Sequence, residues 1–401
     1  MESKIQRKGK SDLKDELGSS ISFYYLLYCD KQTRFDDECE STKNLPEDDR
    51  KNSKIHKSVI NNNEKYKERP SASVSFKVPQ PWSKKHFGRR MDDRWRKSIQ
   101  LSKPSEIGAF KKIKHSGNAE VTVTHDSPPT INISSIIGVD LSDGFDPLGT
   151  GEDTEVPCST DEIMICLNAK KFDLQRNRVN FVTYRNNLNK ILGTPYQKDP
   201  WKIQVSRRQG IIFLEVVKDR SSEPEGEWQR RCCYWGRRFE EYCLGTPHNL
   251  SESDRCEHCV VVRTRLKSHR IIIGAEIDGC MQDPNGPGYV ELKTSKQLLS
   301  RKDQWSFNRY KTLKYWIQSY LVGVPYILVG YRNNDGIICG FENLKTTALS
   351  NVQGRNKLWD SNVCLNFADQ ILTFLTNNTC ENVNYELEFK EPFEQVTLVQ
   401  I

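Results

Sequence analysis

Short apolar runs and amphipathic stretches alternate along this chain from about residue 100 to its end. Runs rich in β-branched and aromatic residues, such as 271–273 and Phe181–Tyr184, predict buried strands, because such side chains pack well on a pleated surface. Apolar residues at helical spacing, such as Leu313, Trp316 and Ile317, predict helices with one buried face. We therefore expect an α+β fold, with mixed, twisted β-sheets flanked by helices.

The same patterns place most of the remaining elements. Further helices are expected at 162–170, 188–192, 228–243, 306–321 and 362–375. Further strands are expected at 121–124, 258–266, 385–389 and 395–398, with hairpins at 201–217 and 326–341.

One stretch combines this strand pattern with an unusual set of charges. Glu276 and Asp278 follow the apolar run 271–273 at a spacing of two, which puts both carboxylates on one face of a strand. A turn rich in Gly, Pro and Asn follows, and a second strand then carries Glu291 and Lys293, again on one face. An antiparallel pair of strands would bring these four groups together. Three acids that close repel one another unless a hard divalent cation offsets their charge.

The alternative is an exposed hairpin whose alternating charges face water. The β-branched run at 271–273 favours the first interpretation, because it is typical of a strand that is buried on both faces.

The charge of the chain is concentrated at its N-terminus. The formal net charge is +7, and the first 100 residues carry all of that excess. Residues 1–100 are also poor in clustered apolar residues, so we expect a largely disordered basic segment followed by a folded domain at 101–401. Basic residues at 84–97 interleave with Trp82, Phe87 and Trp95, which fits a nuclear-localisation signal, an RNA-contacting arm or a solvated linker.

Cysteine usage and the N-terminus bear on the compartment. The chain has 13 cysteines, an odd number, and its charged N-terminus lacks the pattern of a signal peptide. The apolar run at 21–28 is too short to span a bilayer. We expect an intracellular protein with reduced thiols and no membrane partner. Cys256 and Cys259 form a CxxC spacing, but no second pair accompanies them, which disfavours structural zinc.

The ExD…ExK arrangement resembles the core of PD-(D/E)xK nucleases. YVELKTSK at 289–296, the Trp-rich helix after it, LVGVP at 321–325 and GYRNNDG at 330–336 occur in the order typical of the decapping exoribonuclease (DXO) family. This resemblance covers roughly residues 100–400. It implies a metal-dependent hydrolase of RNA 5′ ends that removes incomplete or NAD caps, releases pyrophosphate from 5′-triphosphate RNA, or degrades RNA 5′→3′.

The resemblance also implies roles for individual residues. GRRFE at 236–240 is similar to the acidic motif of the family, although Arg237 stands where an apolar residue is expected. That match favours Glu240 over Glu215 as the further acid. One or two Mg²⁺ or Mn²⁺ ions would be held by Glu240, Glu276, Asp278, Glu291 and the backbone carbonyl of Leu292.

Catalysis and substrate binding share several residues in this interpretation. The catalytic set would be Glu276, Asp278, Glu291, Lys293 and Gln318. Substrate contacts would come from Arg185, Cys259, Glu276, Lys293 and Gln318. Arg263 and Arg265 lie on one face of the strand at 258–266 and could contact RNA phosphates.

Two other functions fit the same resemblance. Some relatives have lost the acids, and some stabilise a partner 5′→3′ exoribonuclease, so a non-catalytic RNA-binding adaptor is the first alternative. A DNA nuclease of the wider PD-(D/E)xK class is the second. The intact acidic set favours an enzyme acting on RNA, expected in the nucleus, with the cytoplasm as the alternative location.

Overall fold

A computed structural model describes residues 73–80, 92–115, 118–147, 158–217, 226–246, 256–282, 288–350 and 358–401. The chain divides into two units, Met1–Pro70 and Ser71–Ile401, and every described residue belongs to the second. The basic segment up to residue 72, residues 84–91 of the basic stretch predicted at 84–97, and residues 283–287 of the turn predicted at 283–288 lie outside the described residues. None of the helices in the described ranges is long and apolar enough to cross a membrane.

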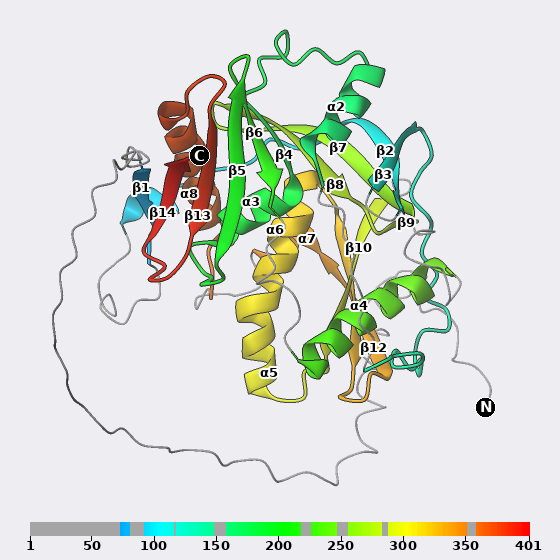
Figure 1. The fold of residues 1–401 in the computed structure, drawn as a ribbon. Coiled ribbons are helices and arrows are strands. Elements are labelled where there is room, and N and C mark those ends of the chain that lie inside the picture. The colour runs from blue at the N-terminus through cyan, green and yellow to red at the C-terminus, as the bar shows by residue number, and fades with distance from the viewer. Residues whose placement is uncertain are drawn as a thin grey trace, which may run out of the picture. The chain divides into compact units, whose positions relative to one another are not determined.

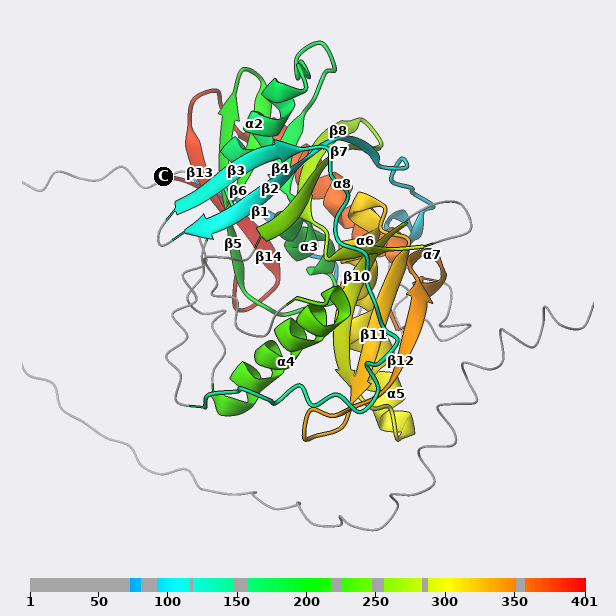
Figure 2. The same ribbon diagram turned by 90° about the vertical axis from the view of Figure 1, so that its right-hand side faces the viewer.

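Strands of the second unit form two sheets, which are seen in Figures 1 and 2. The larger has ten strands in the order β1 (Ser73–Lys77), β14 (Gln395–Gln400), β13 (Asn384–Phe389), β5 (Trp201–Arg208), β6 (Ile211–Val216), β4 (Phe181–Tyr184), β8 (His269–Glu276), β7 (Cys256–Leu266), β2 (Ser105–His115) and β3 (Asn118–Thr124). The smaller has the order β12 (Ile338–Lys345), β11 (Tyr326–Arg332), β10 (Gly288–Lys296) and β9 (Gly279–Met281).

Helices flank both sheets, which confirms the predicted α+β class. The α-helices are α2 (Thr160–Ala169), α3 (Arg185–Gly193), α4 (Glu227–Leu244), α5 (Arg301–Ser306), α6 (Thr312–Val322), α7 (Thr346–Leu349) and α8 (Ser361–Asn378). A 3₁₀ helix covers Asp93–Arg96, and a π-helical turn at Phe307–Lys311 links α5 to α6. The single helix predicted at 306–321 is thus a longer helical segment with a π turn inside it, a feature often found at functional sites.

Apolar clusters hold these layers together in the described part of the chain, and two of them involve α2 and α4. Ile163, Cys166 and Leu167, the predicted apolar face of α2, are fully buried against β2, β4, β6 and β7 of the larger sheet. Trp235 and Phe239 of α4 pack on the smaller sheet in a second cluster. Helices α2 and α4 therefore each bury their apolar face against one sheet.

The sequence predicted that the folded domain starts at residue 101. The structure shows that it begins earlier, with β1 at Ser73–Lys77. Strand β1 pairs antiparallel with β14, and Phe76 packs on Phe367 of α8 with ring centroids 6.1 Å apart. Trp95 is only 8% exposed, and Asn366 Nδ2 donates a hydrogen bond to its carbonyl at 3.1 Å. The apolar pattern did not predict β1 or the burial of Trp95, because both are short apolar features among polar residues.

The pairing expected around the acidic stretch also differs from the prediction. Strand β8 belongs to the larger sheet and ends at Glu276, so Asp278 lies beyond it. The strand that pairs antiparallel with β10 is the three-residue β9, in the smaller sheet. The acids therefore come from two sheets rather than from one hairpin, because the chain crosses between the sheets at Ile277 and Asp278.

Candidate active site

Glu291 is the centre of a compact polar site. It lies in the middle of β10, and its side chain is only 1% exposed. Three donors converge on its carboxylate: Lys293 Nζ at 2.5 Å, Arg185 Nη1 at 3.1 Å, and Gln318 Nε2 through a short hydrogen bond. Burial opposes ionisation of Glu291, but Lys293 and Arg185 outweigh it and hold the pKa of this carboxyl below its usual value.

Parallel strands bring Arg185 to this point. Strand β4 runs parallel to β8, with Tyr184 opposite Gly274, so the chain leaves β4 near the end of β8. Helix α3 begins there at Arg185, whose guanidinium is directed to Glu291 in the other sheet. Arg185 is 7% exposed. Its ion pair therefore links the two sheets at the site.

Asp278 lies between the two sheets and touches β10. Its Oδ2 accepts a hydrogen bond from the backbone N–H of Leu292 at 2.7 Å, and Lys293 Nζ lies 4.0 Å away. Burial and the charge of Glu291 raise the pKa of Asp278 to about 6, against the opposing effect of Lys293. The N–H and C=O of a strand residue point to the same side, so the Leu292 carbonyl also faces Asp278.

Glu276 lies at the mouth of the site. Solvent reaches its side chain, yet the protein around it and the nearby Glu257, Asp278 and Glu240 raise its pKa to about 8. A carboxylate that is both accessible and crowded by other acids is favourably placed to meet a cationic ligand.

A close approach of α4 to the smaller sheet places Glu240 in this group. A Cβ on Gly330 would lie 2.2 Å from the ring of Phe239, so only glycine in β11 leaves room for that ring. Phe239 is fully buried, and Glu240 follows it toward the acids. Both views show α4 alongside β10 (Figures 1 and 2). Arg237, which departs from the family pattern, is half-buried on the same helix.

Cys259 is next to the site but beneath its surface. It pairs directly with Glu276 across β7 and β8, and it is 2% exposed within the apolar cluster under α2. The structure thus places the predicted substrate contact at Cys259 in the core. Cys256 and Cys259 are three apart on one strand and point to opposite faces, which agrees with the view that they do not form a zinc site.

Sequence reasoning missed Glu257 and the cluster behind it. Glu257 precedes Cys259 by two residues, so it shares a face with Glu276, and it contributes more to the raised pKa of Glu276 than Asp278 does. Opposite it on β2, Lys112 is fully buried and pairs with Glu162 of α2 at 2.9 Å. The spacing of two residues to Cys259 on a strand was the available signal.

The donor set fits a hard divalent cation. Glu240, Glu276, Asp278 and Glu291 supply oxygen atoms, and burial together with the neighbouring acids raises the pKa of Glu276 and of Asp278. In the described ranges, no group of three Asp, Glu, His or Cys side chains is close enough together to hold a metal ion without movement. Ion binding would therefore draw the oxygen atoms of these acids closer together.

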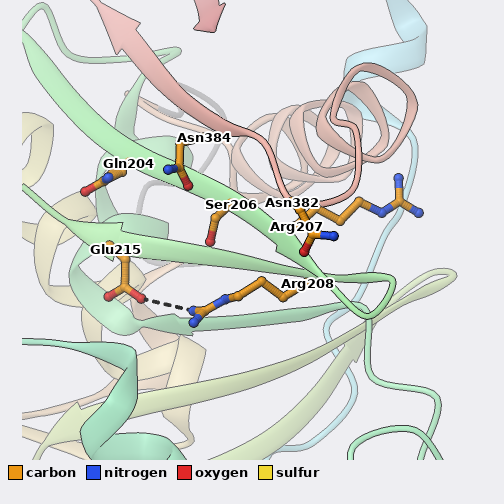
Figure 3. Close-up of a pocket in the computed structure, with 7 residues that line it drawn as sticks. All are labelled: Gln204, Ser206, Arg207, Arg208, Glu215, Asn382 and Asn384. Atoms are coloured by element: carbon orange, nitrogen blue, oxygen red, sulfur yellow. Dashed lines mark ion pairs between the residues drawn. The ribbon is translucent and has the colours of Figure 1, made fainter. Parts of the chain in front are cut away.

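A different pocket, of about 340 Å³, lies on the larger sheet away from the acids (Figure 3). Its charged residues have structural partners: Arg207 donates to the Thr379 carbonyl at 3.0 Å, and Arg208 lies 4.1 Å from the Phe213 ring centroid. Glu215 accepts a hydrogen bond from the first residue of α2, Thr160, at 2.9 Å. Glu215, which was passed over as the further acid, therefore lies outside the candidate site.

Curated proteins of known function match most of this chain. The decapping and exoribonuclease protein of Rattus norvegicus is 31% identical over 305 residues, covering 70% of this chain and 76% of the relative. The decapping nuclease RAI1 of Aspergillus fumigatus is 30% identical over 292 residues, covering 65% and 79%.

Solved structures share the fold. Candida albicans Rai1 in complex with pU5-Mn²⁺ superposes with a TM-score of 0.63 at 19% identity, covering 83% of this chain and 93% of the other. S. pombe Rai1 in complex with 3′-FADP gives 0.61 at 22% identity, covering 76% and 95%. The model of the RAI1-like PD-(D/E)XK nuclease family matches residues 102–401. This chain therefore belongs to the RAI1-like PD-(D/E)XK nuclease family.

Proposed function

We propose that this protein is a metal-dependent hydrolase that acts on the 5′ ends of RNA, removing incomplete or NAD caps or releasing pyrophosphate from 5′-triphosphate ends. The observation that carries the proposal is the placement of Glu276, Asp278 and Glu291, from two sheets, around the donors Lys293 and Arg185. The names of the curated relatives, which are decapping nucleases and exoribonucleases, support the choice of substrate.

The four acids and the Leu292 carbonyl would hold one or two divalent ions, with Mg²⁺ or Mn²⁺ as our candidates. When bound, such ions lower the pKa of water and offset charge on phosphate oxygens. The manganese in the Candida albicans and K. lactis neighbour structures supports this choice of ion. The low pKa of Glu291 keeps at least one donor ionised across the neutral range.

The cationic side of the site suits a phosphate. Lys293, Arg185 and Gln318 already converge on one carboxylate oxygen pair, so they can donate in the same way to phosphate oxygens beside Glu291. In the proposed reaction Arg185 neutralises phosphate charge, while Lys293 and Gln318 orient the attacking water. A nuclear location and a partner 5′→3′ exoribonuclease remain predictions from the family resemblance.

A substrate panel tests the proposal. The purified full-length protein with Mn²⁺ is incubated with one RNA sequence bearing a 5′ triphosphate, an unmethylated cap, an NAD cap or a monophosphate. We expect hydrolysis at one or more of these ends and weaker inhibition by single-stranded DNA than by RNA. Absence of any product with all four ends, or equal inhibition by DNA and by RNA, would contradict it.

A further inference from the structure

A groove of about 270 Å³ lies between α3 and α6. Its volume is near the lower end of the range for small-molecule sites, about 300–1,000 Å³, so it suits one small polar unit rather than a folded macromolecule. The side chains that give the groove its character are Asn189, Lys190, Gln197, Lys314, Ile317 and Gln318.

This groove adjoins the candidate active site through Gln318. Asn189 lies one helical turn after Arg185 on α3, and Lys314 lies one turn before Gln318 on α6, so each pair shares a helix face. Arg185 and Gln318 both donate to Glu291. Gln318 lines the groove and also donates to Glu291, so the groove and the candidate active site meet at Gln318.

The floor of the groove is ordered and its polar groups are satisfied. Ile317 and Trp201 are 3% and 5% exposed. Trp201 Nε1 donates to Thr194 Oγ1 at 3.2 Å, and Thr194 Oγ1 donates to the Lys190 carbonyl at 2.8 Å. The floor is therefore a preformed, partly apolar surface.

The walls carry cations and one buried acceptor without a donor. Lys190 and Lys314 line opposite sides, and Asp199, the single acid among the described lining residues, pairs with Lys314 at 3.4 Å. Asn189 Oδ1 is buried and meets no hydrogen-bond donor among the residues that the structure describes. A buried acceptor of this kind is normally satisfied, so Asn189 Oδ1 is available to a donor that a ligand supplies.

We infer that this groove binds one nucleotide of the RNA substrate, immediately next to the phosphate that is hydrolysed. Lys190 and Lys314 contact its phosphate, its base lies over Ile317 and Trp201, and Asn189 accepts a hydrogen bond from an amino or imino group of the base. The inference rests on the proposed function and adds to it a position and a base contact.

The first test is a double-mutant cycle in which one change is Asn189→Ala in the protein and the other is the removal of one base from the RNA. Pentanucleotide 5′-triphosphate RNAs lack the base at nucleotide 1, 2 or 5, and kcat/KM is measured for wild type and for Asn189→Ala. We expect Asn189→Ala to lower kcat/KM on intact RNA by about 2- to 12-fold, as for one hydrogen bond. Removing the base at nucleotide 1 or 2 should then cost the variant less than wild type by the same factor, with no such difference at nucleotide 5.

The second test measures the cationic contact through salt dependence. Lys314→Met should reduce the slope of log kcat/KM against log salt concentration by about 0.7, the value for one phosphate contact on a single strand. Lys345→Met, a matched change at an exposed lysine on β12, should leave the slope unchanged. The Lys314 side chain is 58% exposed, so this variant is expected to fold even if Asn189→Ala does not.

The outcomes separate this inference from the function on which it depends. If wild type hydrolyses none of the RNAs with Mn²⁺ present, the proposed function fails. If wild type is active but the base-removal effects are equal in Asn189→Ala and wild type at nucleotides 1 and 2, the groove inference is wrong. An unchanged salt slope in Lys314→Met would also overturn it.

Discussion

Asp278→Asn should stabilise the ion-free protein at neutral and higher pH. The pKa of Asp278 is raised from 3.8 to about 6, so ionisation of this buried side chain opposes folding. At about 1.36 kcal/mol per pKa unit, the cost is up to about 3 kcal/mol above pH 7. Asparagine removes the charge and retains an oxygen for the Leu292 N–H, so the free energy of unfolding should rise by a similar amount.

The sign and the pH window follow from the same shift. Below about pH 3.8 the aspartate is protonated in both the folded and the unfolded states, so the advantage of asparagine should vanish. It should grow as the pH rises through 6 and then level off. For a folded unit of this size, 3 kcal/mol corresponds to a melting temperature about 4 °C higher.

The assay is thermal melting of wild type and Asp278→Asn in EDTA at pH 3.8, 6 and 8, repeated with Mn²⁺. Bound Mn²⁺ should raise the melting temperature of wild type more than that of the variant and so reverse their order. Asp335→Asn, in the exposed turn before β12, is the control and should change little. A variant less stable than wild type at pH 8 in EDTA, or no reversal with Mn²⁺, would refute the electrostatic reasoning.

Three further predictions test separate parts of the site and fold. Lys293→Ala should retain Mn²⁺ binding by calorimetry but lower the single-turnover rate by about 10²–10³-fold, and loss of ion binding would show that Lys293 has another role. Gly330→Ala should lower the free energy of unfolding by about 1–3 kcal/mol and lower the activity, because it displaces Phe239 and α4. The control Gly236→Ala, on α4 with open space around it, should reduce neither stability nor activity, as melting and hydrolysis assays can check. Removing residues 1–72 should leave the melting transition in place, but removing 1–98 should lower it, because β1 and Trp95 are lost; equal melting of the two truncations would contradict this.

The local elements were predictable because their patterns are strong. The run at 271–273 became β8, Phe181–Tyr184 became β4 with the same bounds, and the helical stripe of Leu313, Trp316 and Ile317 is buried in α6. The two strands are short runs rich in β-branched and aromatic residues, and the helix has apolar residues at helical spacing, so each local pattern favours one type of element.

What could not be predicted depends on contacts between distant residues. The pattern around Glu276 and Glu291 is the same whether β8 or β9 pairs with β10, and the assignment of β8 to the larger sheet follows from its parallel pairing with β4, about 90 residues earlier. The importance of Gly330 depends in the same way on Phe239. Glu257 was missed because its effect arises through Glu276 on the neighbouring strand.

The central claim is that acids from two sheets act together through divalent cations on an RNA 5′ end. Single-turnover hydrolysis of a 5′-triphosphate RNA, measured against Mn²⁺ concentration for wild type and for Glu276→Gln/Asp278→Asn, tests it most directly. We expect wild-type hydrolysis that requires Mn²⁺ and is abolished by EDTA, and a folded double variant that is inactive at every Mn²⁺ concentration. Wild-type hydrolysis that persists in EDTA, or full activity of the double variant, would contradict the claim.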